Sequence, residues 1–205
     1  MAAGRPPVAV LDYGVGNLHS AAKALDRAGA DVRVVPTVAD ATGAAGLLVP
    51  GVGAYGACLQ GLARAGGGDG IRAWLASGRP LLGVCIGMQL LFEASEEGPV
   101  PDGVGALPGT VRRLTGDVKI PHIGWDEVTV TPGSRLFADL GDGTRFYFVH
   151  SYAADAGPDT AATCDYAGKW AAAVERGNLF GTQFHPEKSG PTGLRLLANF
   201  VEVCR

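Results

Sequence analysis

The sequence has no hydrophobic run long enough to cross a membrane. A transmembrane helix needs about 20 consecutive apolar residues, and no apolar stretch among these 205 residues approaches that length. The first residues, Met1–Pro7, also lack the long apolar core of a secretory signal peptide. We therefore expect a cytoplasmic protein that has no membrane partner.

The chain also lacks a large excess of charge of either sign. Its 17 lysine and arginine residues and 20 aspartate and glutamate residues leave a formal net charge of −3. Proteins that bind nucleic acids or anionic membranes usually present strongly basic surfaces. The charge balance therefore argues against both kinds of partner, and a hydrophobic content of 47% indicates a folded globular chain.

Cysteine and histidine are scarce and scattered. The four cysteines form no Cys-x-x-Cys pair, and together with the four histidines they show no spacing typical of zinc sites. A disulfide framework is not expected either, because cytosolic proteins rarely carry one. We interpret one cysteine as a nucleophile and three as small core or surface thiols, and we expect neither a metal nor a cofactor. The cysteines are Cys58, Cys85, Cys164 and Cys204.

What the chain does contain is a regular alternation of short apolar runs and helical segments. The runs 8–13, 31–35 and 46–49 are typical of strands that are buried on both faces. After the first run, Asn17 can cap a helix over residues 18–28. This alternation predicts an α/β fold in which helices cover a doubly wound, mostly parallel sheet.

The second half of the chain departs from this rhythm. Strand patterns over 110–114 and 127–130 surround a predicted loop, 119–125, and indicate an antiparallel extension of the sheet. We find no repeat or linker, so we expect residues 1–205 to form a single domain. The remaining predicted elements are strands over 145–150, 161–164, 171–176 and 179–183 and a closing helix over 192–203.

Cys85 is the strongest candidate for chemistry. The run 80–84 predicts a buried strand and 88–92 predicts a helix, so Cys85 lies at the turn between them. Gly83 and Gly87 flank it as Gly-x-Cys-x-Gly, the cysteine version of the Gly-x-Ser-x-Gly nucleophile elbow. A helix N-terminus would favour the thiolate, which is the nucleophilic form. The alternative is a buried structural cysteine, the commoner role of a lone cysteine, but the two glycines favour a nucleophile.

His185 is the best candidate for the base that such a nucleophile needs. It follows a run with strand character, 179–184, and Glu187 lies two residues further on. A proton-shuttling imidazole is usually oriented by a carboxylate, and His-Pro-Glu supplies both groups in three residues. A histidine in a loop is otherwise most often a solvated surface residue, so His185 gains weight only together with Cys85.

Several short motifs are specific together, although each is weak alone. The glycine-rich stretch at 50–53, the elbow at 83–89 and His-Pro-Glu at 185–187 resemble, in this order along the chain, the class I (triad) glutamine amidotransferases. That family implies a flavodoxin-like fold and a Cys-His-Glu triad that hydrolyses glutamine to glutamate and ammonia. Three further stretches resemble the glutaminase subunits of imidazole glycerol phosphate synthase, an enzyme of histidine biosynthesis: residues 11–18, 119–125 and 148–152.

The resemblance also implies roles for individual residues. Cys85 would attack the carboxamide carbon of glutamine, His185 would protonate the departing ammonia, and Glu187 would orient the imidazole. The positions that hold glutamine in the family correspond to four residues of this chain: Gln89, Glu97, Ser151 and Tyr152.

The stretch 50–56 matches the pattern Gly-x-Gly-x-x-Gly. A dinucleotide site would need this motif at the first strand-to-helix turn and an acidic residue at the end of the next strand, and neither condition is met. We interpret the stretch as a flexible loop whose backbone amides form an oxyanion hole. The resemblance assigns that hole to Gly51, Val52 and Gly53, together with the amide of Ile86 just after the nucleophile.

The resemblance further implies a protein partner. In such synthases a cyclase subunit with a (β/α)₈ barrel receives the ammonia and joins it to a phosphorylated ribulosyl compound, so we expect a heterodimer. This chain has no basic cluster that could bind such a bisphosphate, which agrees with a synthase activity in the partner. The family places five residues towards the partner: Asn17, Lys119, Trp125, Tyr147 and Lys188.

Other functions stay open at this point. A stand-alone cysteine hydrolase, such as a peptidase or a γ-glutamyl hydrolase, would share the elbow architecture. A catalytically silent binding subunit would share the fold. Within the family, the glutaminase of pyridoxal phosphate synthase is the nearest competitor, and the motifs at 119–125 and 148–152 argue against it.

Some local predictions concern segments between the motifs. The polar, glycine-rich stretch 65–70 is predicted to be a surface connector. The acidic run 93–98 is predicted to be a solvated helix end, from which Glu97 could hold the substrate ammonium. The prolines at 99–101 are predicted to interrupt the secondary structure. We expect His122 to be simply hydrogen bonded rather than a second catalytic base.

Overall fold

The computed structural model describes residues 4–98 and 102–205. The interruption of regular secondary structure predicted at 99–101 therefore lies outside the described residues. Over these ranges the helices are α1 (Leu18–Arg27), α2 (Tyr55–Arg64), α3 (Gly67–Ala76), α4 (Ile86–Gln89) and α5 (Gly190–Val203), with 3₁₀ turns η1 (Ala39–Ala41) and η2 (Pro186–Lys188). The strands are β1 (Pro7–Leu11), β2 (Asp31–Val35), β3 (Gly46–Val49), β4 (Leu81–Val84), β5 (Phe92–Ser95), β6 (Leu107–Arg113), β7 (His122–Val130), β8 (Thr144–His150), β9 (Tyr152–Ala154), β10 (Thr160–Asp165), β11 (Lys169–Arg176) and β12 (Leu179–Thr182).

The main sheet joins parallel and antiparallel parts. Its strand order is β2-β1-β3-β4-β12-β11-β10-β7-β8. Pairing is parallel from β2 to β12 and antiparallel from β12 to β8. A smaller sheet, in the order β5-β6-β9, lies beside it. This confirms the predicted mostly parallel α/β fold with an antiparallel extension.

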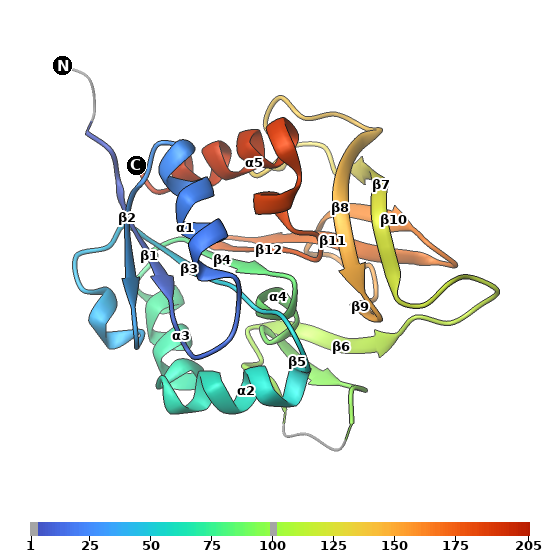
Figure 1. The fold of residues 1–205 in the computed structure, drawn as a ribbon, viewed down its shortest axis with the longest axis horizontal. Coiled ribbons are helices and arrows are strands. Elements are labelled where there is room, and N and C mark those ends of the chain that lie inside the picture. Colours follow the sequence, from blue (N-terminus) through green and yellow to red (C-terminus); the bar gives the residue numbers. More distant parts are fainter. Residues whose placement is uncertain (1–3, 99–101) are drawn as a thin grey trace.

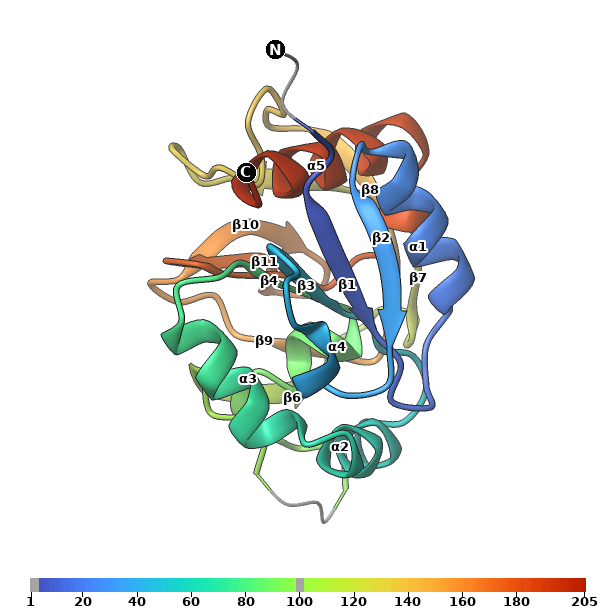
Figure 2. The same cartoon turned by 90° about the vertical axis from the view of Figure 1, so that its left-hand side faces the viewer.

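Helices cover both faces of the parallel part, which is why its central strands are apolar. Figures 1 and 2 show α1 and α5 on one side of the sheet and α2 and α3 on the other. Strands β3, β4 and β12 are buried at every position, as is typical of strands enclosed between two helical layers. None of the helices in the described ranges is long and apolar enough to cross a membrane.

The first helix begins where the sequence predicts. The side chain of Asn17 accepts a hydrogen bond from the backbone N–H of Ser20 at 3.2 Å, which satisfies one of the free N–H groups of the first turn. Helix α1 then runs to Arg27. The capping prediction for Asn17 is confirmed, and the cap leaves this side chain near the carboxyl ends of the parallel strands.

The predicted surface connector at 65–70 is wrong. Helix α3 begins inside this stretch, at Gly67, after Gly66 adopts a left-handed conformation (φ 67°). Gly67 is buried, and a Cβ there would lie 2.3 Å from the side chain of Leu62. The glycines therefore allow α2 and α3 to pack closely, a role that polarity alone does not reveal.

The helix predicted after Cys85 is much shorter than expected. Helix α4 ends at Gln89, and Phe92 starts strand β5, which pairs with β6 through Phe92 and Leu107. The acidic run from residue 93 is thus partly strand and not a helix end. The run 88–92 is buried throughout, so its apolar character does not distinguish a helix from a strand.

The loop predicted at 119–125 is also partly wrong. Strand β7 already begins at His122, and its pairing with β8 runs from His122–His150 to Val128–Thr144. The two strands place alternate side chains on opposite faces. One face is buried against the core, and the other carries Trp125 opposite Tyr147.

Candidate active site

Candidate active-site residues follow the carboxyl ends of three neighbouring strands. The 50–53 loop follows β3, Cys85 follows β4, and His185 comes shortly after β12. These strands lie side by side in the sheet. In open α/β sheets this edge is where ligands bind, so segments far apart in the sequence meet at one place.

Cys85 occupies a strained turn. Its backbone has φ 55° and ψ −114°, an unfavourable conformation for a residue with a side chain. Its N–H donates to Thr182 O at 2.7 Å, and its carbonyl accepts from the N–H groups of Met88 and Gln89 at 3.0 and 3.1 Å. The turn is thereby tied both to β12 and to α4, and these contacts offset the backbone strain.

Glycines make this turn possible by allowing close backbone contact. A Cβ on Gly83 would lie 2.7 Å from Gly87 O, and a Cβ on Gly87 would lie 2.0 Å from Val49 O. Gly51 faces the same turn, since its Cβ would lie 2.5 Å from the Gly87 nitrogen. The Gly-x-Cys-x-Gly pattern and the glycine-rich loop are therefore parts of one packed unit.

His185 is buried and oriented by Glu187. Its Nδ1 lies 2.8 Å from Glu187 Oε1, and the two side chains are 1% and 7% exposed. The backbone N–H of His185 donates to Tyr147 O at 2.9 Å, and its carbonyl accepts from Ser189 Oγ at 2.7 Å. Contacts on both sides of the backbone thus fix the position of the ring.

The charges around His185 favour its protonated form. Burial lowers the pKa of His185, but the Cys85 sulfur and the Glu187 carboxylate outweigh this and raise the pKa to about 9. Nε2 is buried and has no hydrogen-bond partner within bonding distance among the described residues. The expected helix dipole contributes little, because α4 is a single turn, so the charge that faces Cys85 comes from His185.

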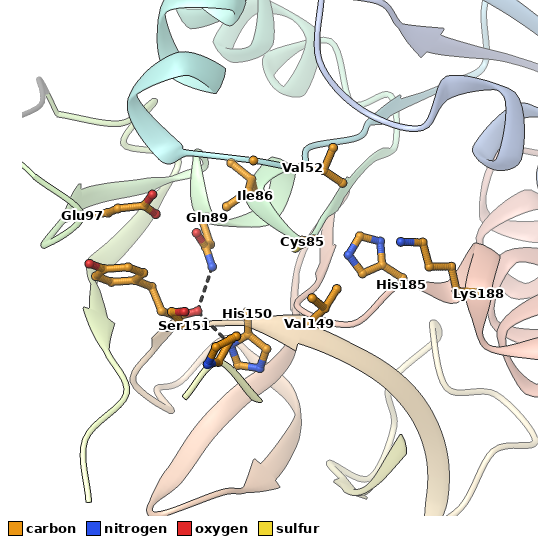
Figure 3. Close-up of a pocket in the computed structure, with 13 residues that line it drawn as sticks. Val52, Cys85, Ile86, Gln89, Glu97, Val149, His150, Ser151, His185 and Lys188 are labelled. Atoms are coloured by element: carbon orange, nitrogen blue, oxygen red, sulfur yellow. Dashed lines mark hydrogen bonds between the residues drawn. The ribbon is translucent and has the colours of Figure 1, made fainter. Parts of the chain in front are cut away.

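A pocket of about 390 Å³ opens beside these groups. Figure 3 shows Cys85 and His185 on one side of it and Glu97 on the other. All four residues predicted to hold glutamine line the pocket. The residues predicted to form the oxyanion hole also line it, except Gly51. The predicted site residues on its wall are Val52, Gly53, Cys85, Ile86, Gln89, Glu97, Ser151, Tyr152, His185 and Lys188.

Gln183 is a site residue that the sequence analysis missed. Its Oε1 accepts a hydrogen bond from Gln89 Nε2 at 2.9 Å, and its Nε2 lies 3.7 Å from Cys85 Sγ. Gln89 Nε2 also donates to Tyr152 O at 2.9 Å. Its position two residues before His185 is the only hint that the sequence offers of a role in the site. A glutamine at the end of a buried strand has no distinctive pattern of its own.

Glu97 holds the start of α2 as well as facing the pocket. Its Oε1 accepts from the Tyr55 N–H at 3.1 Å. This contact links the acidic segment to the helix that follows the 50–53 loop. The carboxylate therefore contacts the first residue of that helix and also borders the pocket.

The residues predicted to face a partner differ in their position relative to the pocket. Lys188 lines the pocket directly. Trp125 is 49% exposed and meets Tyr147 edge-on, with ring centroids 6.2 Å apart. Asn17 lines a small neighbouring cavity with Glu187, whereas Lys119 is exposed and its carbonyl accepts from Tyr166 Oη.

Comparison with known proteins decides the family. The sequence profile described as "Glutamine amidotransferase class-I" matches residues 9–204 of this chain, nearly its whole length. The chain belongs to the class I glutamine amidotransferases. This confirms the resemblance that rested on the elbow, the glycine-rich loop and the His-Pro-Glu motif.

Individual relatives of this amidotransferase point in one direction. A protein of Mycolicibacterium paratuberculosis named "Imidazole glycerol phosphate synthase subunit HisH" is 52% identical over 200 residues, 95% of this chain and 97% of the relative. A protein of the same name from Moorella thermoacetica is 45% identical over 201 residues, 97% of this chain and 96% of the relative. The chain is therefore similar to these subunits from end to end.

Solved structures share the fold of this amidotransferase. A structure described as a glutamine amidotransferase covers 96% of this chain and 98% of its own, with a TM-score of 0.76 and 23% identity. A structure described as PurLQS from Thermotoga maritima covers 98% of this chain and 100% of its own, with a TM-score of 0.78 and 20% identity. At these identities the comparison supports the fold alone.

Proposed function

We propose that this amidotransferase is the glutaminase subunit of an imidazole glycerol phosphate synthase. The observation that carries the proposal is that one pocket is lined by Cys85, on its strained turn, and by His185, which the buried Glu187 carboxylate orients from behind. The end-to-end similarity to subunits of that name, at 45–52% identity, supports this synthase over the pyridoxal phosphate type.

The reaction begins with attack on the glutamine amide. Cys85 Sγ forms a bond to the carboxamide carbon, and the carbonyl electron pair moves to the oxygen. The tetrahedral intermediate then breaks its C–N bond, and His185 donates its Nε2 proton to the nitrogen, which leaves as ammonia. A γ-glutamyl thioester remains on Cys85.

The second half of the reaction releases glutamate. Water attacks the thioester carbon while His185, now neutral, accepts a proton from it. The C–S bond breaks, and glutamate leaves with the oxygen of the water. Glu187 keeps the Nδ1–H side of the ring fixed throughout, so that Nε2 faces the reacting atoms in both halves.

Backbone amides stabilise the negative oxygen of the intermediate. We assign this role to the amides of Val52 or Gly53 together with that of Ile86, all of which border the pocket. Gly51 contributes by packing, because it holds the loop against the nucleophile turn. Each oxyanion donor is worth about 3–4 kcal/mol in measured cases, so the orientation of this loop can decide the rate.

The rest of the pocket holds the amino-acid part of glutamine. Glu97 supplies a carboxylate for the substrate ammonium. Ser151 and Tyr152 line the same pocket from the junction between β8 and β9. Gln89 Oε1 is buried without a hydrogen-bond partner among the described residues and is available to the substrate. Gln183 holds Gln89 in this orientation through the bond at 2.9 Å.

A cyclase partner takes up the ammonia in this proposal. We propose a heterodimer with a (β/α)₈ barrel, whose own active site carries the lyase chemistry. The outward face of β7 and β8 offers an apolar surface for it, since Ile123 and Trp125 are 56% and 49% exposed. Lys188, at the mouth of the pocket, and Asn17, nearby, complete this candidate contact surface.

The direct test is reconstitution with the cyclase subunit from the same source. We expect glutamate release to depend on the partner and to rise when the ribulosyl substrate binds the cyclase. Cys85→Ala should abolish glutamine-dependent synthesis, while ammonia added at high pH should still support the cyclase reaction. Rapid peptide or polyglutamate hydrolysis by the lone chain would instead identify a stand-alone hydrolase.

A further inference from the structure

His122, Asp126 and Cys164 form a cluster on the buried side of the antiparallel extension. His122 and Asp126 belong to β7, and Cys164 belongs to the neighbouring strand β10; Figure 1 shows these strands beside each other, away from the parallel part of the sheet. His122 Nε2 lies 3.3 Å from Asp126 Oδ2. With the sulfur of Cys164, these atoms all lie within 4.8 Å of one another. The proposed reaction uses none of these residues.

Hydrogen bonds determine which nitrogen of His122 carries a proton. A backbone carbonyl can only accept, so His150 Nδ1, which lies 2.9 Å from Tyr152 O, must be the N–H. His150 is buried, and neither of its hydrogen-bond contacts in the described part of the chain is acidic. Its Nε2 is therefore bare and accepts from His122 Nδ1 at 3.2 Å.

Because His122 carries its proton on Nδ1, its Nε2 is unprotonated and presents a lone pair. The same nitrogen faces the Asp126 carboxylate, which also offers lone pairs, and the Cys164 sulfur completes the set. Without a metal Cys164 is a thiol, and its single proton can be donated to only one of the other two groups, so the imidazole lone pair and the carboxylate still face each other at 3.3 Å as acceptors. A cation between the three groups would satisfy both acceptors and replace the thiol proton. We propose that this cluster is a binding site for a divalent cation of the zinc class, held by His122 Nε2, the Asp126 carboxylate and the Cys164 thiolate.

The surroundings already hold the imidazole in a ligand orientation. The ring of Tyr166 stacks on His122 with centroids 3.8 Å apart, and Phe148 stacks on it at 4.9 Å. Metal-bound histidines usually donate their other ring N–H to a second group, as His122 does to His150. Ligand atoms around one tetrahedral zinc lie roughly 3.3–3.8 Å apart, so small side-chain rotations close the site.

The donor set selects the class of cation. One imidazole, one thiolate and one carboxylate suit zinc or a similar borderline metal, whereas magnesium and calcium prefer oxygen ligands alone. The Asp126 side chain is 34% exposed, while that of His122 is only 5% exposed. The cation therefore enters past Asp126, where a water completes four ligands, and the Cys164 thiol releases its proton to solvent on binding.

A bound cation at this place would be coupled to the substrate pocket. His150 lines that pocket, and its hydrogen-bond acceptor, Tyr152 O, is also the acceptor of Gln89 Nε2. Binding at His122 fixes the proton on its Nδ1 and thereby the orientation of His150. Hydrogen bonds through His150 and Tyr152 O thus connect the proposed cation site with Gln89, which belongs to the proposed glutamine site.

The test is titration of the chain with Co²⁺, which reports its ligands by absorption. It should be done in a Cys85→Ala background, because Cys85 and His185 could themselves bind metal. We expect one cobalt per chain, with a thiolate-to-cobalt band and the visible bands of four-coordinate cobalt. Cys164→Ser should remove the thiolate band, and Asp126→Asn should weaken binding at least about 10-fold, as the loss of outer-shell partners already does at other sites.

Cys204→Ser in the same background is the matched control, since Cys204 is a buried thiol at the end of α5. It should bind Co²⁺ as the background does. The proposal is overturned if no cobalt binds, or if the thiolate band survives Cys164→Ser. Circular dichroism checks folding of each variant; if Cys164→Ser unfolds, Asp126→Asn decides, because its partly exposed position tolerates the change, and unchanged cobalt affinity there also overturns the site.

Discussion

The side-chain amide of Gln183 lies 3.7 Å from the sulfur of Cys85. The same side chain accepts a hydrogen bond from Gln89, so it connects the proposed nucleophile with a residue of the proposed glutamine site. Gln183 and Cys85 are both buried. A substitution of Gln89 would therefore alter the surroundings of the Cys85 sulfur through the side chain of Gln183.

A glutamine-like electrophile should label Cys85 and leave the other cysteines largely unmodified. Burial is the main cause that raises the pKa of Cys58 to about 11 and the pKa values of Cys164 and Cys204 to about 12. These three remain thiols near neutral pH, and thiols are poor nucleophiles. Mass mapping after treatment with a diazo-ketone analogue of glutamine gives the answer; labelling mainly at another cysteine would disprove the assignment of Cys85.

His185→Ala should reduce glutaminase activity more than Glu187→Ala. His185 transfers protons in both halves of the proposed reaction, whereas Glu187 orients and polarises it through the 2.8 Å contact. We expect the loss at His185 to exceed that at Glu187 by roughly 10- to 100-fold, as in other triads where the orienting acid is the less costly member. Single-turnover rates with saturating glutamine and partner provide the comparison, and equal losses would contradict these roles.

The pH dependence of kcat/KM should follow His185. The pKa of His185 in the folded protein, about 9, lies above the ordinary histidine value of 6.5, so the protonated ring that donates to the departing nitrogen is lost as pH rises through about 9. We expect activity to fall there, and Glu187→Gln to move this fall to lower pH because it removes one of the charges that raise the pKa. An unchanged alkaline limb in Glu187→Gln would count against this coupling.

The same pKa shift affects stability with a definite sign. Because the folded pKa lies above the unfolded one, the contribution of His185 is fully present below pH 6.5 and disappears as pH rises through about 9. Denaturant unfolding of the wild type across this range, compared with His185→Ala, isolates that contribution. The difference between the two proteins should shrink towards high pH.

Gly87→Ala should destabilise the fold and inactivate the enzyme. The added Cβ would lie 2.0 Å from Val49 O, so either the turn or strand β3 must move. Overpacking of this kind costs typically about 1–3 kcal/mol. Gly141→Ala is the control, because a Cβ there meets nothing within 4 Å; chemical denaturation of both variants should show a loss only for Gly87.

Lys188→Ala should weaken ligand-stimulated turnover more than it weakens assembly with the partner. Lys188 is exposed, lies next to Glu187 and lines the pocket, and a single rim charge contributes only about 0–1 kcal/mol to affinity. The lone wild-type chain should be almost inactive, with the 50–53 loop reoriented only in the stimulated complex. Glutamate release and complex affinity are measured in parallel, with Lys169→Ala as an exposed control; full activity of the lone wild-type chain would rule out this form of control.

The alternation of strands and helices in the parallel part of the sheet, and the tight turn that carries Cys85, could be derived from the sequence alone. Buried strands leave continuous apolar runs, such as Leu81–Val84, and tight turns leave glycines, such as Gly83 and Gly87. Both are local requirements of the backbone, so they appear as local patterns. The His-Pro-Glu motif is readable for the same reason, since His185 and Glu187 interact across only one residue.

Only the tertiary structure decided where the chain stops following such patterns. The run 88–92 is apolar because it is buried, and whether it forms helix or strand depends on the pairing of Phe92 with Leu107. Gln183 reaches Gln89 and Cys85 across more than 90 residues of sequence. His122 and Cys164 likewise lie on different strands, so no spacing along the chain indicates that they meet; such contacts arise from strand pairing, which local sequence does not specify.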